Sequence, residues 1–200
     1  MLRTKLTGAV AAAAFIGGAW TAPSIANAAE TFQIDPAHAF VYYKANHFGW
    51  SQNMGRFNKV SGSFTIDEKN PAASKVEVVI DAASIDTAHE ARDKHLRSPD
   101  FFNVKEFPTI KFTSTKVEKI ADKKGRLTGN LTMLGVTKPV SFDFTWGAKS
   151  PHFRNKDMIH TGFSAEVTIN RADWGMKKFP PQAIGHKITL FLEIEGKRKK

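Results

Sequence analysis

The amino-acid sequence predicts an all-β protein, an antiparallel β-barrel of about eight or nine strands with one short helical insert at about residues 84–102. Apolar and polar residues alternate over several short segments, as in a strand with one buried face, and Val140–Trp146 shows the pattern best. Turn-forming residues separate these segments about every 10–12 residues, which is typical of a sandwich or a barrel. Closure into a barrel also removes exposed sheet edges, which favours the barrel.

The first 28 residues have the pattern of a secretory signal peptide, with cleavage near Ala28 and Ala29. The pattern consists of a basic start, an apolar run over Leu6–Trp20 and small residues before the cleavage position. A membrane anchor is the disfavoured alternative, because the run is shorter than the ~20 residues that span a bilayer. We therefore expect an exported, periplasmic protein in which residues 29–200 form a single barrel domain.

Four strands are expected before the helical insert. Alternation and β-branched residues place them at Phe32–Asp35, Ala39–Phe48, Phe57–Asp67 and Lys75–Asp81. Pro36 should end the first strand, because proline has no N–H to donate to a sheet. The glycine-bounded segment Gly49–Gly55 is predicted to be a loop.

The helical insert is expected to form a short helix over Ala88–Arg97. Thr87 and Glu90 have the spacing of a capping box, in which two side chains satisfy backbone N–H groups of the first turn. A Ser-Pro dipeptide marks the end of the helix. The adjacent Phe101 and Phe102 must cover other apolar surface, so we expect the insert to cap the mouth or flank of the barrel.

Five further strands are expected after the insert, at Thr109–Val117, Leu127–Leu134, Val140–Trp146, Ile159–Asn170 and His186–Glu195. The segment from Gly147 to Lys156 is expected to be a loop. A barrel of eight strands is just wide enough to hold one small or slender ligand. Large apolar residues on both faces of some strands fit either an enclosed apolar cavity or a solid core, and the sequence leaves both open.

Charge and composition exclude several classes of function. The formal net charge is +10, but the basic residues are spread along the chain and export argues against a nucleic-acid partner. The one basic cluster, Lys197–Lys200, is either a solvated end or a contact with an anionic membrane surface. The chain has no cysteine, which excludes disulfides, thiol chemistry and thiolate metal sites.

The sequence shows no catalytic motif. It lacks a G-x-S-x-G elbow, and His89 and His95 do not have the spacing of a helical zinc pair. Seven histidines could meet at a metal only through the tertiary fold, and the four to consider are His47, His89, His95 and His186. We therefore expect neither an enzyme nor a metal site.

Five segments form a long combined pattern in a fixed order. They are DPAHAFVYYKANHFG from Asp35 to Gly49, SIDT from Ser84 to Thr87, HEARDKHLRSPDFFNVKEFPTIKFTST from His89 to Thr115, GNLTMLGVTKPVSF from Gly129 to Phe142, and NRADWGM from Asn170 to Met176. This combination closely resembles the YceI-like family of polyisoprenoid-binding, lipocalin-like proteins. The resemblance covers nearly all of residues 29–200.

The resemblance implies a periplasmic, lipocalin-like barrel whose apolar cavity takes an isoprenoid chain. The bound molecule would be a polyprenyl lipid such as a polyprenyl phosphate, or a ubiquinone-type isoprenoid quinone. We expect the cavity wall to include Val41, Tyr43, Phe64, Ile110, Phe112, Leu131, Phe142, Phe144, Val167, Leu190 and Leu192. For the polar headgroup of the ligand we expect Arg92, His95, His47 and Trp174.

Three functions remain open at this stage. The first is an exported carrier or sequestering protein for an amphiphilic isoprenoid lipid. The second is an enzyme acting on a lipid or quinone, or a redox partner. The third is a stress or interaction protein with a filled core and no ligand. A homodimer through a strand edge or through the Phe101–Phe102 region is a further expectation.

Overall fold

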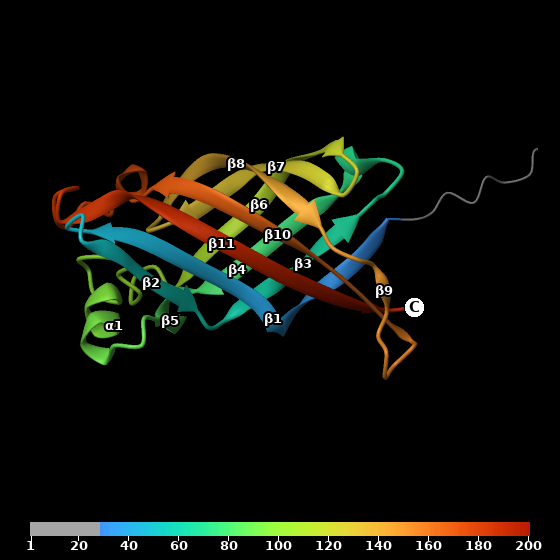
Figure 1. Ribbon diagram of the computed structural model, residues 1–200, viewed down its shortest axis with the longest axis horizontal. Coiled ribbons are helices and arrows are strands. Elements are labelled where there is room, and N and C mark those ends of the chain that lie inside the picture. The colour runs from blue at the N-terminus through green and yellow to red at the C-terminus, as the bar shows by residue number, and fades with distance from the viewer. Residues whose placement is uncertain (1–28) are drawn as a thin grey trace, which may run out of the picture.

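Eight long strands close into one antiparallel barrel in the computed structural model, which describes residues 29–200 (Figure 1). The predicted signal peptide, residues 1–28, lies outside the described residues. In order around the barrel the strands are β1 (Glu30–His47), β3 (Val60–Ile66), β4 (Lys75–Asp81), β6 (Thr109–Ala121), β7 (Lys124–Met133), β8 (Val136–Trp146), β10 (Met158–Asn170) and β11 (Ile184–Lys199). Pairing of β11 with β1 completes the ring and confirms the predicted barrel.

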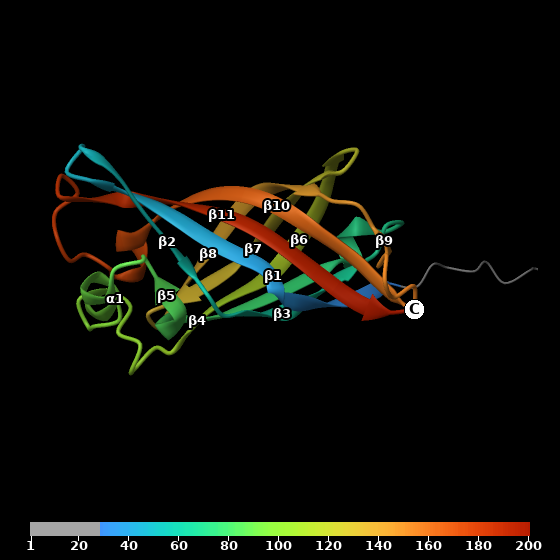
Figure 2. The same cartoon turned by 60° about the horizontal axis from the view of Figure 1, so that its bottom comes forward.

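The short elements gather at the two ends of the barrel. At one end lie α1 (Glu90–Leu96), β2 (Ser51–Phe57) and β5 (Ile85–Asp86), while β9 (Ser150–Pro151) and the C-terminus lie at the other (Figures 1 and 2). These ends are called the α1 end and the β9 end. The turns of 3₁₀ helix are η1 (Pro71–Ala73), η2 (Ala82–Ser84) and η3 (Arg171–Trp174). The strand β9 lies within the segment that was expected to be a loop.

The first strand does not end at Pro36, which corrects the prediction. β1 continues to His47, and its register against β11 shifts between Ile34 and Ala39. Proline is tolerated in a strand at such a bulge, because a residue outside the regular ladder need not donate an N–H. The bulge therefore lets one long strand run the length of the barrel.

The predicted loop over Gly49–Gly55 is also wrong, because most of it forms β2. This strand pairs with β1 from Val41 to His47 in a hairpin. The hairpin turn uses positive φ angles at Phe48 (52°) and Gly49 (75°). The first residues of β2 are polar, so they show no alternation of apolar and polar side chains that would indicate a strand. The strand expected over Phe57–Asp67 corresponds to β3, except that its first residue, Phe57, is the last residue of β2.

The helix is present but shorter than predicted, and its capping box does not form. His89 is the N-cap, and its Nδ1 accepts the Arg92 N–H at 3.2 Å. The N–H and hydroxyl of Thr87 instead donate to the buried Asp93 carboxylate at 2.9 and 2.5 Å. Ala88, with φ of 57°, separates Thr87 from the helix. Thr87 therefore anchors the helix from outside it.

The apolar core fills much of the barrel and continues beneath the helical insert. Phe32 and Phe64 are almost fully buried, and their rings stack at 5.4 Å. At the α1 end Phe101 is buried, and the Phe102 ring packs edge-on against Phe57 at 5.5 Å. The insert therefore caps this end of the barrel, as its two phenylalanines indicated.

Candidate ligand-binding cavity

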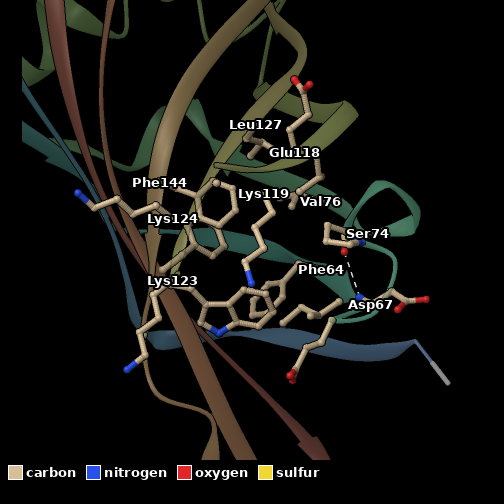
Figure 3. A pocket seen from close by; sticks show the side chains of 18 of the residues that line it. Phe64, Asp67, Ser74, Val76, Glu118, Lys119, Lys123, Lys124, Leu127 and Phe144 are labelled. Carbon is tan, nitrogen blue, oxygen red and sulfur yellow. Dashed lines mark hydrogen bonds between the residues drawn. The ribbon is translucent and has the colours of Figure 1, made fainter. Parts of the chain in front are cut away.

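The inside of the barrel holds two cavities that share part of their walls. The inner cavity, about 170 Å³, lies toward the α1 end and is lined there by Leu96, Phe101 and Phe102. The outer cavity, about 450 Å³, lies at the β9 end, and Figure 3 shows its lining from close by. Residues that line both cavities are Val76, Leu127 and Phe163. The two cavities therefore adjoin each other inside the barrel, and their walls together extend along much of its length.

All the residues predicted for the cavity wall line one of these cavities. The inner cavity is lined by Val41, Tyr43, Ile110, Phe112, Leu131, Phe142, Val167, Leu190 and Leu192. Phe64 and Phe144 line the outer cavity instead. The alternation of each strand therefore identified the face that points inward. Contact of these side chains with a ligand stays a prediction.

The structure adds further wall residues that the sequence analysis did not select. The inner cavity also has in its lining Val76, Val78, Ile80, Leu127, Met133, Val140, Phe163, Ile169, Met176, Ile184, Ile188 and Ile194. Several of them share a strand face with a predicted residue, such as Val140 with Phe142. Extending the same alternation along each strand would have found them. The loop residue Met176 carried no such signal.

Tyr43 brings one of the few polar atoms to the inner cavity. Burial raises the pKa of its hydroxyl to about 12, with a smaller lowering effect from the Arg92 charge. The hydroxyl is therefore neutral across the physiological range and can donate a hydrogen bond. It lies beside β2, because a Cβ on Gly55 would be 2.7 Å from the Tyr43 oxygen.

Arg171 is a buried cation at the wall of the inner cavity, and the sequence analysis missed it. Only 2% of the residue is exposed, and burial lowers its pKa. Its guanidinium donates to four carbonyl oxygens, those of Met176, Phe179, Ile184 and Gly185 at 2.6, 3.3, 2.9 and 3.1 Å. Arg171 therefore holds the segment between η3 and β11 closed over the α1 end.

The residues predicted for the headgroup all lie at the α1 end, and none of them lines either cavity. The His47 ring packs edge-on against Phe48 and Trp50, at 4.9 and 5.9 Å between ring centres. Arg92 donates from Nε and Nη2 to the hydroxyl and carbonyl oxygens of Thr87, both at 2.8 Å. Both side chains already have partners within the protein.

The other predicted headgroup residues are engaged as well. His95 Nε2 lies 2.9 Å from an Asp100 carboxylate oxygen, and this contact lowers the pKa of Asp100. Trp174 is buried, and its indole N–H donates to the Leu131 carbonyl oxygen at 3.0 Å. A headgroup role for these residues stays a prediction, because none of them lines either cavity.

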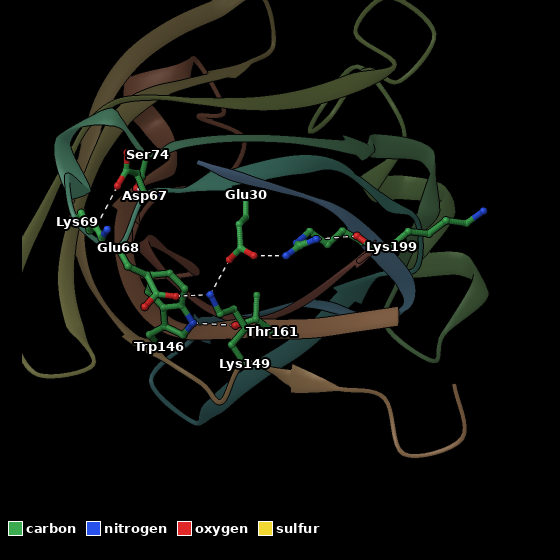
Figure 4. A network of polar contacts seen from close by, with 10 residues as sticks. Glu30, Asp67, Glu68, Lys69, Ser74, Trp146, Lys149, Thr161 and Lys199 are labelled. Atoms are coloured by element: carbon green, nitrogen blue, oxygen red, sulfur yellow. Dashed lines mark hydrogen bonds and ion pairs between the residues drawn. The ribbon is translucent and has the colours of Figure 1, made fainter. Parts of the chain in front are cut away.

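Charged side chains surround the outer cavity at the β9 end. The Lys149 ammonium donates to Glu30 at 2.6 Å and to Glu68, and Glu30 also accepts from Arg198 (Figure 4). Burial alone would raise the pKa of Glu30, but the hydrogen bonds from Lys149 and Arg198 bring it below its ordinary value. Burial likewise opposes the charge of Lys149, and its two carboxylate partners raise its pKa overall. The network ties β1 and β11 to the turns beyond β3 and β8.

Residues 29–200 hold neither a metal-binding cluster nor a helix that could span a membrane. No group of three or more His, Cys, Asp or Glu side chains in this range could hold a metal ion, so the four histidines considered above do not form one. No helix in the same range has the length and apolar character needed to cross a membrane.

Comparison with known proteins gives consistent matches over the barrel. The family model described as YceI-like domain matches residues 32–196. Protein YceI of Escherichia coli O157:H7 is 42% identical over 171 residues, which cover 82% of this chain and 83% of the relative. A UPF0312 protein of Pseudomonas aeruginosa is 42% identical over 170 residues, which cover 81% and 83% of the two chains.

Solved structures show the same fold. The YCEI protein of Campylobacter jejuni has a TM-score of 0.69 at 31% identity, covering 78% of this chain and 90% of its own. BcnA of Burkholderia cenocepacia gives 0.74 at 19% identity, covering 81% and 98%. A polyisoprenoid-binding domain of Saccharophagus degradans, implicated in plant cell wall breakdown, gives 0.62 at 14% identity, covering 82% and 97%.

Proposed function

The chain belongs to the YceI-like domain family, and from that premise we propose that it is an exported carrier or sequestering protein for an amphiphilic isoprenoid lipid. The observation that carries the proposal is the pair of adjoining cavities inside the barrel, of which the inner one has an almost wholly apolar wall. Tyr43 and Arg171 are the only residues of the inner cavity lining with a polar side chain. An isoprenoid tail is apolar along its whole length, so such a wall suits it.

The energetics favour a chain-like ligand. Each CH₂ group removed from water contributes about 0.8 kcal/mol, so a tail of several isoprene units gains affinity with length. A few polar groups at the mouth then distinguish one headgroup from another. A polyprenyl phosphate and an isoprenoid quinone both fit this description. The name of the Saccharophagus degradans domain, which shares the fold, supports the isoprenoid class.

The proposed location rests on the sequence. The predicted signal peptide would deliver residues 29–200 to the periplasm. A barrel without cysteine needs no disulfide to fold there. A carrier in this compartment would shield an isoprenoid lipid from water between membranes. The predicted homodimer stays a prediction, because the structure describes a single chain.

The first test identifies what the barrel holds. Protein from the exported fraction is examined by gentle native mass spectrometry, and any bound molecule is extracted into solvent and identified. We expect a stoichiometric mass excess that extracts as a polyprenyl lipid or an isoprenoid quinone. A clean apo mass, with no uptake of added polyprenyl lipids, would favour the ligand-free protein with a filled core.

A second test fills the inner cavity. Phe112→Trp or Leu131→Trp places a larger ring in the inner cavity wall and should abolish lipid uptake, at a stability cost of about 1–3 kcal/mol. Phe40→Trp on the exposed outer face of β1 is the matched control and should leave uptake unchanged. Uptake is measured by native mass spectrometry and stability by urea unfolding. Normal uptake by a folded inner-cavity variant would contradict the proposal.

A further inference from the structure

We propose that the bound lipid lies with its tail toward the α1 end and with an anionic headgroup at the β9 end, where Lys119 contacts it. The inference rests on the proposed function, because it assigns an orientation and a headgroup charge to the same ligand. It places the headgroup at the opposite end from the residues that sequence reasoning selected.

The two ends of the barrel interior differ in the residues that bound them. At the α1 end the inner cavity is bounded by Phe101, Phe102 and Met176, and Arg171 fixes the adjoining segment through four carbonyl contacts. At the β9 end the outer cavity has the larger volume and charged groups in its lining, among them Lys119 and Lys149. The outer cavity therefore offers several charged groups to the polar end of an amphiphile, whereas the inner cavity offers only the Tyr43 hydroxyl and the Arg171 guanidinium, which is bonded to carbonyl oxygens.

Lys119 is placed to reach into the outer cavity. It follows the buried Val117 by two residues on β6, so both side chains lie on the inward face of the strand. In Figure 3 the Lys119 side chain extends into the hollow, whereas Lys123 and Lys124 extend away from it. A lysine in such a place can pack its aliphatic stem against apolar surface while its ammonium stays accessible to water.

The charges around the opening leave Lys119 available to a ligand. Lys149, the other inward cation, is already paired with Glu30 and Glu68.

The other carboxylates that line the cavity are mostly engaged with other groups. Glu118 pairs with Lys116 at 2.7 Å, and Asp67 accepts the backbone N–H groups of Lys69 and Asn70. Asp122, at the tip of the β6–β7 hairpin, is the last carboxylate in the cavity lining. Among the described residues Lys119 forms no ion pair within 4 Å, so its charge is free to pair with a phosphate.

The experiment compares two probes of equal chain length, a polyprenyl monophosphate and the corresponding neutral polyprenol. Lys119→Gln should weaken binding of the phosphate about fivefold, and Lys119→Glu should weaken it further, while both bind the alcohol as the parent protein does. The difference should shrink as salt rises to about 1 M. Lys111→Gln on the same strand is the matched control, because Lys111 is exposed and lies on the outward face.

The outcomes separate the inference from the proposed function. Unchanged binding of the phosphate to both Lys119 variants overturns the assignment of the headgroup, even when both probes bind well. Equal weakening of phosphate and alcohol overturns it too, because Lys119 would then act through packing. If the parent protein binds neither probe, the proposed lipid-binding function itself fails.

Discussion

At the scale of the residue, the Asp35 side chain stabilises the bulge in β1. Its carboxylate accepts from the Ala37 N–H and from Lys197 Nζ at 3.3 and 3.1 Å, and His38 Nδ1 lies 3.0 Å away. Only 8% of the side chain is exposed. Burial alone would raise the pKa of Asp35, but these hydrogen bonds lower it to about 2. The charged form is therefore the one that stabilises the folded state.

The depressed pKa of Asp35 predicts a specific loss of stability in acid. The contribution is fully present above the ordinary pKa of 3.8 and is lost as the pH falls through about 2. Its size at neutral pH is about 2 kcal/mol. Asp35→Asn should therefore be less stable than the parent protein at pH about 7, and the gap should narrow as the pH falls from about 4 to about 2. Urea unfolding at each pH measures the gap.

The exposed Asp122 provides the control for this prediction. Asp122→Asn removes the same charge from a hairpin tip and should change stability little at any pH. A gap between the parent protein and Asp35→Asn that stays constant with pH would contradict the assigned role of the carboxylate.

Individual site residues were predictable to different degrees. Val41 and Leu192 could be placed on the cavity wall, because strand alternation fixes which face points inward. Arg171 could not, since its partners are carbonyl oxygens up to 14 positions away that only the fold brings together. Lys119 was equally hidden, because a lysine near a hairpin usually indicates a solvated turn.

At the scale of the element, the pairing of β3 with β4 depends on Gly62. Its φ is 133°, and a Cβ there would lie 2.1 Å from the Glu77 carbonyl oxygen. Both the backbone conformation and the close approach of β4 therefore require glycine. Gly175, which ends η3, also has a positive φ of 86°, but its Cβ would meet no atom within 4 Å.

These two glycines should differ in how much stability the protein loses when each is replaced by alanine. Gly62→Ala should destabilise the protein by about 3 kcal/mol or more, because strain and a backbone clash add. Gly175→Ala should cost about 1 kcal/mol, since only the left-handed conformation is penalised. Urea unfolding of both variants tests this. Equal losses would show that the ladder can shift to admit a side chain at Gly62.

Strands in which apolar and polar residues alternate were predicted well, and strands without this alternation were not. Ile159–Asn170 could be recognised as a strand from its alternation, and it forms nearly all of β10. The first half of β2 is polar and is held by backbone pairing with β1. Backbone pairing does not depend on which side chains a strand carries, so the composition of the segment did not indicate a strand. The helix was found, but the role of Thr87 depended on the buried Asp93, a tertiary contact that local spacing could not reveal.

The distribution of charge bears on the whole molecule. Lys197 and Arg198, half of the predicted basic cluster, are paired with Asp35 and Glu30. Lys199 and Lys200 remain exposed at the β9 end. Exposed apolar side chains, Ile120 and Phe153, belong to the β6–β7 hairpin and the segment after β9. The same end therefore combines basic and apolar surface beside the opening of the outer cavity.

This arrangement predicts that the protein binds anionic membranes through the β9 end. Vesicles that contain anionic lipid should bind more tightly than zwitterionic vesicles, and salt should weaken the binding. Replacing both Lys199 and Lys200 with Glu should reduce the affinity about tenfold or more, measured by vesicle sedimentation. The same double replacement at Lys94 and Lys105, near α1, is the control. Equal losses from both pairs would mean that net charge alone governs binding.

The pairing of β1 with β11 has a consequence for how the barrel is made. Gln33 is opposite Lys197, so β1 can pair with β11 only when the other end of the chain has been synthesised, although β2 and β3 are available to it earlier. Contacts so distant in sequence slow folding, because a large loop must close before they form. A chain that stops before Ile184 lacks β11 and therefore keeps two open sheet edges, one on β1 and one on β10.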